Sequence, residues 1–265
     1  MNVEQLFDLS GKVVIITGAA GNLGSRYAVG LSQFGANVVL ADIDYIKCKQ
    51  MAKKIKEKYL TDPEPIKLDL TKKKSISNVV SKVLKKYSKI DVLINNAAYQ
   101  GNDKIRKTSF ENLSLDDWNK SISVNLTGVF LMCQQVGKIM KKQKQGNIIN
   151  IGSTYGLVAP DQRIYGDSGQ NAAAFYSASK GGVINLTRYL ASYWNRTGIR
   201  VNTLTPGGVG NNQKSNFIKK YSNKTMLGRM AKKDEYVSAI LFLSSDASSY
   251  MTGSNLIIDG GWTAW

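Results

Sequence analysis

The sequence predicts an α/β protein with one doubly wound parallel sheet, formed as a single domain of residues 1–265. Six short apolar segments alternate with helix-like segments, a pattern typical of parallel strands buried on both faces. A chain of 265 residues is long enough to bury a full core as one domain. The predicted strands are residues 13–17, 38–41, 92–95, 147–151, 200–204 and 255–258.

The first predicted strand runs directly into a glycine-rich turn that ends at Gly24. A helical pattern follows, in which Tyr27, Leu31 and Phe34 recur on one side. Glycines allow the backbone to approach a pyrophosphate closely, and a helix N-terminus supplies amide donors and a partial positive charge. The segment therefore predicts a dinucleotide-binding turn.

The second predicted strand ends at Asp42, which fixes the expected choice of cofactor. A carboxylate at this position can accept hydrogen bonds from both hydroxyls of the adenosine ribose. The 2′-phosphate of NADP would meet a negative charge here, and the next residue, Ile43, offers no compensating cation. The pattern favours NAD over NADP.

Tyr176 and Lys180 are four residues apart, so on a helix they share one face. A free tyrosine, with a pKa of about 10, is a poor acid or base at neutral pH. A fixed positive charge nearby stabilises the phenolate and lowers that pKa. The pair is therefore a candidate device for proton transfer.

Further segments occur along the chain, and together with these motifs they stand in the order found in one known family. They are Asp69-Leu70, Asn95-Asn96-Ala97-Ala98, Asn125 within Val124–Gly128, Ser153, Pro206-Gly207, and the stretches 251–253 and 259–261. With these segments the chain resembles the classical short-chain dehydrogenases/reductases over nearly its whole length. A finer and weaker resemblance is to gluconate-5-dehydrogenase-like enzymes and to oxidoreductases of surface-sugar pathways.

The resemblance implies a single-domain Rossmann fold, a catalytic tetrad of Asn125, Ser153, Tyr176 and Lys180, and a homotetramer or homodimer. Tyr176 would transfer the proton, Ser153 would position the substrate oxygen, and Asn125 would hold a water that links Lys180 to solvent. The cofactor contacts that it implies are Gly18, Gly21, Asn22, Leu23, Gly24, Asp42, Asp69, Leu70, Asn96, Ala97, Tyr176, Lys180, Pro206, Gly207 and Val209.

The chain departs from the family pattern in the glycine turn and after Ser153. Asn22 stands where the family has its second glycine, and asparagine tolerates left-handed backbone better than most residues. The segment 154–175 is longer than its family counterpart and carries Tyr155, Arg163 and Tyr165. Beside the catalytic residues Ser153 and Tyr176, these three side chains are the candidate substrate contacts, although the insert could equally lie in solvent or against a neighbouring subunit.

Composition narrows the classes of function. The chain has no histidine and two cysteines, which excludes Ser-His-Asp hydrolysis and the usual zinc sites, so no metal is expected. It contains no apolar run long enough to span a membrane and no signal-peptide pattern at its start, so we expect a cytoplasmic protein.

The formal net charge of +17 raises the possibility of a nucleic-acid partner. The lysines occur in short pairs and triplets on helix-like segments and are not interleaved with stacking aromatics, as a single-strand groove would require. We interpret them as a solvated surface that can attract small anions. No nucleic-acid or membrane partner is expected.

The sequence as a whole predicts an NAD-dependent oxidoreductase that interconverts a secondary alcohol and a ketone. The expected substrate is a polar sugar, sugar acid or sugar nucleotide. One alternative is a 3-oxoacyl-carrier-protein reductase, against which Asp42 argues because that enzyme would favour NADPH. A second alternative, of another class, is a non-catalytic nucleotide-sensing or nucleic-acid-binding Rossmann module, against which the complete tetrad argues.

Overall fold

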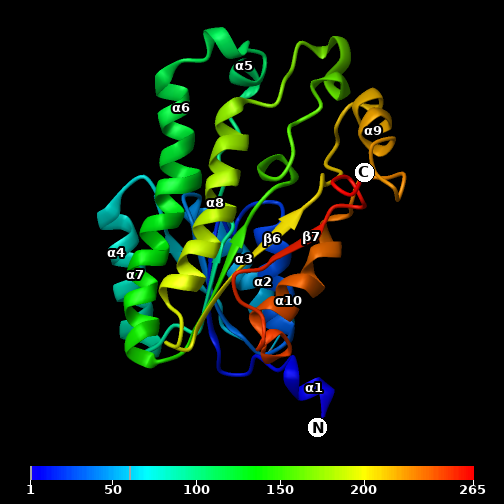
Figure 1. Ribbon diagram of the computed structural model, residues 1–265. Coiled ribbons are helices and arrows are strands. Elements are labelled where there is room, and N and C mark those ends of the chain that lie inside the picture. The colour runs from blue at the N-terminus through cyan, green and yellow to red at the C-terminus, as the bar shows by residue number, and fades with distance from the viewer. Residues whose placement is uncertain (1, 60) are drawn as a thin grey trace.

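The computed structural model describes residues 2–59 and 61–265, so Met1 and Leu60 of the predicted domain lie outside the described residues. Over these residues, seven parallel strands form one sheet in the order β3-β2-β1-β4-β5-β6-β7 (Figure 1). The strands are β1 (Val13–Thr17), β2 (Asn37–Asp42), β3 (Glu64–Lys67), β4 (Val92–Asn95), β5 (Gly146–Ile151), β6 (Ile199–Pro206) and β7 (Asn255–Ile258). The predicted doubly wound parallel sheet is confirmed.

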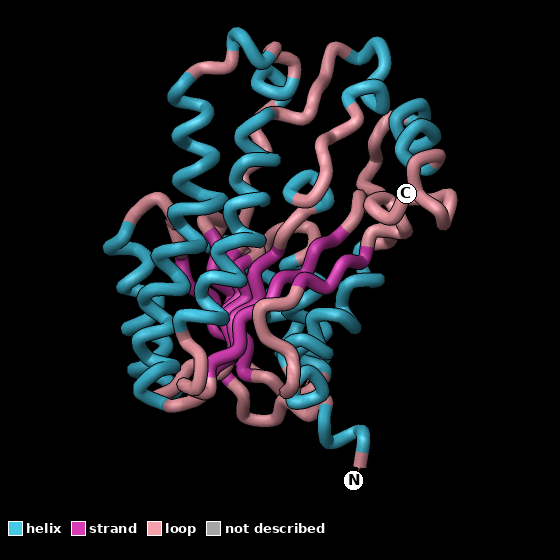
Figure 2. The backbone as a smooth tube through the Cα atoms, in the orientation of Figure 1, coloured by secondary structure: helices cyan, strands magenta, loops and turns pink. Residues whose placement is uncertain are grey.

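Helices cover both faces of the sheet (Figure 2). They are α1 (Val3–Leu6), α2 (Gly24–Gln33), α3 (Tyr45–Lys58), α4 (Lys73–Tyr87), α5 (Asp103–Arg106), α6 (Leu115–Ile122), α7 (Gly128–Gln143), α8 (Ala174–Tyr193), α9 (Ser215–Ser222) and α10 (Val237–Ser244). A π-helical segment, Ser123–Thr127, joins α6 to α7. Short 3₁₀ turns lie at Phe110–Asn112, Thr154–Gly156, Gln162–Ser168, Lys233–Tyr236 and Asp246–Ser248.

Two hydrophobic cores lie on opposite faces of the sheet because side chains alternate along each strand. In β1, Val14 and Ile16 pack with α2, α3 and α10, whereas Val13 and Ile15 pack with α4, α7 and α8. All five residues of β1 are buried. The apolar runs seen in the sequence are thus strands covered on both sides, as expected for a parallel sheet.

The sequence prediction missed β3 and misplaced one side chain. β3 is a four-residue strand that contains a proline and pairs only with β2, at the edge of the sheet, where a missing N–H is tolerated. Its composition gave no apolar run to detect. Phe34, expected to pack with Tyr27 and Leu31, follows the last residue of α2 and is 43% exposed.

The carboxyl ends of all seven strands point to one edge of the sheet, since every pair is parallel. The segments α5, α9 and the turn Gln162–Ser168 gather above this edge (Figure 1). Ligands of open α/β sheets bind in the crevice at this edge. Within the described chain, no helix combines the length and the apolar character needed to cross a membrane.

Candidate active site

A cavity of about 640 Å³ opens at the carboxyl ends of β1, β2 and β4. Its lining includes most of the residues that the sequence assigned to the cofactor: Gly18, Gly21, Asn22, Asp42, Asp69, Leu70, Asn96 and Ala97. The volume lies in the range of known small-molecule and cofactor sites. The structure therefore brings together, in one cavity, residues that are spread over 80 positions of the chain.

Gly18 is the residue on which the glycine-rich turn depends. Its φ is +65°, and a Cβ atom there would lie 2.7 Å from the Cα of Ala97. Gly24, at the start of α2, packs so closely that a Cβ would collide with the Gly18 carbonyl. The left-handed residue of the turn is thus Gly18, and Asn22 keeps an ordinary negative φ. The turn tolerates Asn22 without needing the left-handed backbone that the sequence suggested.

Asp42 is held at the end of β2 with acceptor capacity to spare. Its Oδ2 accepts from the Ala20 N–H at 2.9 Å, and its Oδ1 accepts from the Asp44 N–H at 3.0 Å. A carboxylate offers about four lone-pair sites, so two remain. This carboxylate, next to the exposed Ile43, is suited to a ribose with two free hydroxyls.

Asn96 lines the cavity, but its side chain is used within the protein. Its Nδ2 donates to the carbonyls of Thr17 and Gly18 at 3.0 Å each. The Thr17 hydroxyl in turn accepts from the N–H groups of Asn96 and Ala97. These bonds fix the end of β4 to the glycine-rich turn, so Asn96 shapes the cofactor cavity through the backbone.

The remaining predicted cofactor residues fall at two places. Leu23 precedes the first residue of α2, beside the turn. Pro206 ends β6, and Gly207 and Val209 follow it at the same edge of the sheet. Gly207 lines a separate cavity of about 370 Å³ instead of the one that contains Asp42. Pro206, Gly207 and Val209 thus lie at the carboxyl edge of the sheet but do not line the main cavity.

A buried polar network fixes α8 to the sheet. The Asn95 Nδ2 donates to the Asn150 Oδ1 at 2.8 Å, and the Asn150 Nδ2 donates to the Thr187 hydroxyl at 2.9 Å. The Thr203 hydroxyl donates to Thr187 at 2.8 Å. Hydrogen bonds between buried side chains are strong because the local dielectric is low. The helix that carries Tyr176 and Lys180 is therefore held against β4, β5 and β6.

Lys180 is almost fully buried, with 3% of its surface exposed. Its Nζ donates to the Ile151 carbonyl at 2.6 Å and lies 5.8 Å from the centre of the Tyr176 ring. Burial disfavours the ammonium form and lowers the pKa of Lys180 to about 8. Near neutral pH the side chain still carries most of its charge.

The pKa of Tyr176 is raised in the structure, whereas the sequence predicted that it would be lowered. Burial raises the pKa of its phenol, and hydrogen bonding from Ser153 and from Gln100 offsets only part of that rise. The sequence predicted a lowered pKa from Lys180. The raised pKa of Tyr176 follows from burial of the phenol, which outweighs these hydrogen bonds.

Ser153 lies beside the Tyr176 phenol, and Asn125 is linked to the Tyr176 carbonyl through the Ser179 hydroxyl. The Ser153 hydroxyl follows β5 and accepts from the Tyr155 N–H at 3.2 Å. Asn125 lies in the π-helical segment, a feature frequent at functional sites. Its side chain is fully buried and bonds to Tyr99, Ser121 and Ser179. A water held by Asn125 would therefore have to bond its main-chain carbonyl.

A second, small cavity of about 90 Å³ contains the Tyr176 side chain. It is lined by Gln100, Arg106, Tyr155, Tyr165, Asn171, Ala172, Ala173 and Tyr176. Tyr155 and Tyr165 are thus where the sequence predicted. Gln100, Arg106 and Asn171 were missed, although the first two follow β4 at the carboxyl edge, where the same rule had drawn attention to Tyr99.

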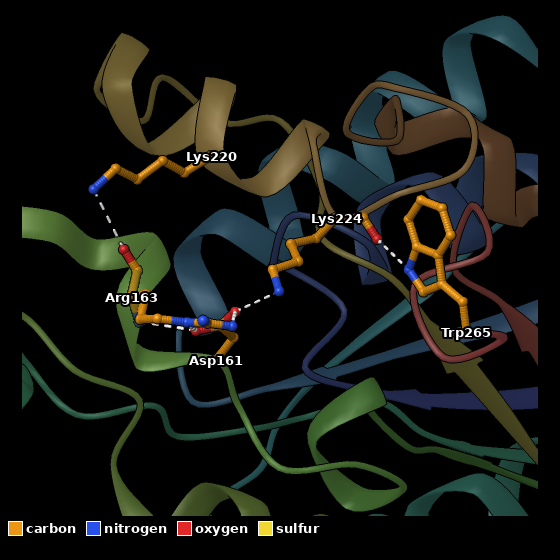
Figure 3. Close-up of polar contacts among 5 residues, drawn as sticks. All are labelled: Asp161, Arg163, Lys220, Lys224 and Trp265. Carbon is orange, nitrogen blue, oxygen red and sulfur yellow. Dashed lines mark hydrogen bonds and ion pairs between the residues drawn. The ribbon is translucent and has the colours of Figure 1, made fainter.

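Arg163 is not part of this cavity. It is 84% exposed at its side chain and forms a two-pronged ion pair with Asp161, at 2.8 and 2.9 Å. Figure 3 shows its guanidinium lying against Asp161, which Lys224 approaches from the other side at 2.7 Å. Arg163, which the sequence predicted as a substrate contact, thus lies outside the small cavity, with its guanidinium paired to the Asp161 carboxylate.

The insert packs against its own chain. The Tyr165 ring lies 5.5 Å from the Phe217 ring of α9, and Tyr221 stacks on Trp262 at 4.3 Å. Ile164 is buried in the same cluster. Residues 161–168 of the insert therefore pack against α9 and the C-terminal segment. Tyr155 and Tyr165 of the insert line the small cavity.

Comparison with known proteins gives consistent matches over almost the full length. A family model described as enoyl-(acyl carrier protein) reductase matches residues 18–263. The chain is 37% identical over 257 residues to the 3-oxoacyl-(acyl-carrier-protein) reductase of Thermotoga maritima, covering 96% of this chain and 98% of that protein. It is 34% identical over 262 residues to the NAD-dependent glycerol dehydrogenase of Listeria innocua, covering 97% and 96%.

A solved structure that resembles this chain is a gluconate 5-dehydrogenase from Burkholderia cenocepacia in complex with NADP and tartrate. It superposes with a TM-score of 0.88 at 29% identity and covers 100% of both chains.

Proposed function

The chain belongs to the short-chain dehydrogenase/reductase family, as an oxidoreductase that acts on CH–OH groups, and from this premise we propose its finer function. We propose that it is an NAD(H)-dependent enzyme that interconverts a secondary alcohol and a ketone on a small polar substrate. The observation that carries the proposal is the arrangement of Tyr176 in a small polar cavity with Lys180 behind it on the same helix.

The main cavity fits a nicotinamide dinucleotide. The close approach of backbone at Gly18, where a Cβ would collide with Ala97, leaves space for a pyrophosphate beside the start of α2. The carboxylate of Asp42 has free acceptor sites for the ribose of NAD. When bound, the cofactor accepts or supplies the hydride.

The protein's own contribution is proton transfer and positioning. In alcohol oxidation, Tyr176 as phenolate takes the hydroxyl proton, and Ser153 orients the substrate oxygen with its hydroxyl. Lys180 places a positive charge beside the Tyr176 ring, which favours the phenolate that oxidation requires. Reduction of the ketone is the reverse, with Tyr176 as the proton donor.

Steady-state assays with purified protein test this function. Reduction of NAD⁺ and of NADP⁺ would be followed over a panel of polyols, sugar acids, sugar nucleotides and 3-hydroxyacyl thioesters. We expect turnover with NAD⁺ on a small hydroxylated substrate. Turnover confined to NADP⁺ and 3-hydroxyacyl thioesters would instead support the carrier-protein reductase, which the 37% identity to such an enzyme favours. Absence of turnover, with salt-dependent binding of random DNA, would support the non-catalytic alternative.

The raised pKa of Tyr176 predicts opposite pH profiles for the two directions. Below its pKa the side chain is a phenol, which can donate a proton, and above it a phenolate, which can accept one. Oxidation needs the acceptor, so its kcat/KM should rise with pH through the alkaline range. Reduction needs the donor, so its kcat/KM should fall over the same range. Profiles that are flat in both directions would remove Tyr176 from this role.

We also propose that the chain associates with copies of itself through the outer face of α7 and α8. Phe130, Tyr189 and Tyr193 are exposed there by 44, 61 and 63%, and such apolar clusters mark contact surfaces. Sedimentation velocity should give a dimer or tetramer. The double variant Tyr189→Glu with Tyr193→Glu should shift it to a smaller species, whereas Tyr250→Glu, at another exposed tyrosine, should not. A monomeric parent protein would contradict this proposal.

A further inference from the structure

Arg106 is a cation in the substrate cavity that the proposed reaction has not used. It ends α5, is half-buried, and lines the 90 Å³ cavity together with Tyr176. Arg26, Arg163 and Arg229 each pair with a carboxylate, at 3.3, 2.8 and 2.6 Å. Among the residues that the structure describes, none forms an ion pair or a hydrogen bond with the Arg106 guanidinium. Its charge is therefore available to a ligand.

The rest of the cavity wall suits an anion. In the described part of the chain, no aspartate or glutamate lines it. Its other polar groups, the amides of Gln100 and Asn171 and the hydroxyls of three tyrosines, all include a hydrogen-bond donor. A half-buried guanidinium has lost part of its hydration, and a charge-assisted bond to an anion compensates for the lost bonds to water. Arg106 therefore gives the lining of the cavity a net positive charge.

The backbone holds Arg106 in this place. The Asn171 N–H donates to the Arg106 carbonyl at 2.7 Å, and the Asn171 Nδ2 donates to the Thr108 carbonyl at 2.8 Å. Asn102 caps α5 by accepting from the Ile105 N–H at 3.0 Å. Asn171 lies at the end of the insert, three residues before α8 begins. The insert therefore ties Arg106 to the helix that carries Tyr176.

The volume of the cavity, about 90 Å³, suits a compact anionic group. A carboxylate with an adjacent carbinol group is such a group. One guanidinium also balances the single charge of a carboxylate better than a phosphate ester, which carries about −1.5 to −2 at neutral pH.

We propose that the substrate is a hydroxy acid, interconverted with the corresponding keto acid, and that Arg106 binds its carboxylate through two parallel N–H···O bonds. The inference rests on the proposed function and narrows its substrate class. Overall, the hydroxy acid and NAD⁺ give the keto acid, NADH and one proton. The carboxylate at Arg106 places the neighbouring carbinol oxygen toward Tyr176, because both side chains line the same small cavity.

Matched substrates and variants test this inference. Purified parent protein would be assayed with hydroxy acids, with neutral polyols of the same chain length and with their phosphate esters. For the hydroxy acid, Arg106→Ala should lower kcat/KM about 10- to 100-fold, mainly through KM, since bonds to charged groups are strong. Its affinity for NADH should stay unchanged, and its kcat/KM for the neutral polyol should fall far less than that for the hydroxy acid. Arg106→Gln, which keeps the length of the side chain, should show the same selective loss if Arg106→Ala folds poorly.

Arg163→Ala is the matched control, since it removes an arginine that is paired with Asp161 outside the cavity. It should behave like the parent protein on the hydroxy acid. The inference is overturned if the parent prefers neutral polyols or phosphate esters to hydroxy acids, or if the Arg106 variants lose activity equally on charged and neutral substrates. If no substrate of the panel supports NAD⁺ reduction by the parent protein, the proposed function itself is overturned. That result differs from turnover with a preference for neutral or phosphorylated substrates, which overturns only the inference about Arg106.

Discussion

Replacing Tyr176 by phenylalanine should lower kcat by about 10²–10⁴-fold, the usual contribution of a positioned acid or base. The hydroxyl accepts from the Gln100 amide at 3.4 Å and bonds with Ser153, so its loss removes few contacts and should leave the fold intact. The ring stays in place beside Lys180. Affinity for NADH, measured by fluorescence titration, should therefore be unchanged.

Tyr189→Phe is the control for Tyr176→Phe. It removes a hydroxyl from the same helix, but from a side chain that is 61% exposed. This variant should keep the parent's kcat. Turnover of Tyr176→Phe within a few-fold of the parent would show that another group transfers the proton.

Replacing Asp42 by alanine should reverse or remove the preference for NADH over NADPH. The ribose hydroxyls lose the carboxylate as a partner, and because one such bond is worth about 1.5–3 kcal/mol, affinity for NADH should fall at least roughly 10- to 100-fold. Affinity for NADPH should rise, because its 2′-phosphate no longer meets a negative charge. Fluorescence titration of both cofactors against both proteins measures the two effects.

Two further variants separate the ribose contact from other roles of Asp42. Asp42→Asn keeps an amide oxygen that can accept from the Ala20 N–H, and it should show the same shift in preference if charge is the cause. Asp44→Asn removes a charge two residues away, from an exposed residue that caps α3. It should leave the cofactor preference unchanged. Equal affinities for NADH and NADPH in the parent protein would contradict the role given to Asp42.

The sequence predicted the sheet well where burial leaves a clear signature. Strands covered on both faces read as apolar, β-branched runs, and all six such runs are strands. β3 escaped because it lies at the edge of the sheet, where neither an apolar run nor a complete set of N–H groups is required. The glycine-rich turn and Asp42 were found because their spacing is set locally, by one strand, one turn and one helix.

The substrate side of the site was predicted less well because it depends on contacts between distant segments. Arg163 is close to Tyr176 in sequence, yet its guanidinium binds Asp161 outside the cavity. Arg106 is 70 positions from Tyr176 and reaches the same cavity because Asn171 ties its backbone to the end of the insert. No local pattern distinguishes a paired arginine from an unpaired one.

The pKa values of Tyr176 and Lys180 likewise could be judged only from the folded structure. From the sequence, the charge of Lys180 was expected to dominate and to lower the pKa of Tyr176. In the structure burial dominates for both groups, raising the pKa of the phenol and lowering that of the ammonium to about 8. Burial depends on how α8 packs on the sheet, which a motif of five residues does not contain.

Transfer of an isotopic label tests the central claim most directly. A substrate of the panel that carries deuterium on its carbinol carbon would be incubated with the parent protein and NAD⁺, and the NADH and the product would be analysed by mass spectrometry. We predict that the deuterium appears in NADH and that an equal amount of ketone forms. Deuterium released to water, or a product formed without NADH, would show that this chain is not the dehydrogenase that its site describes.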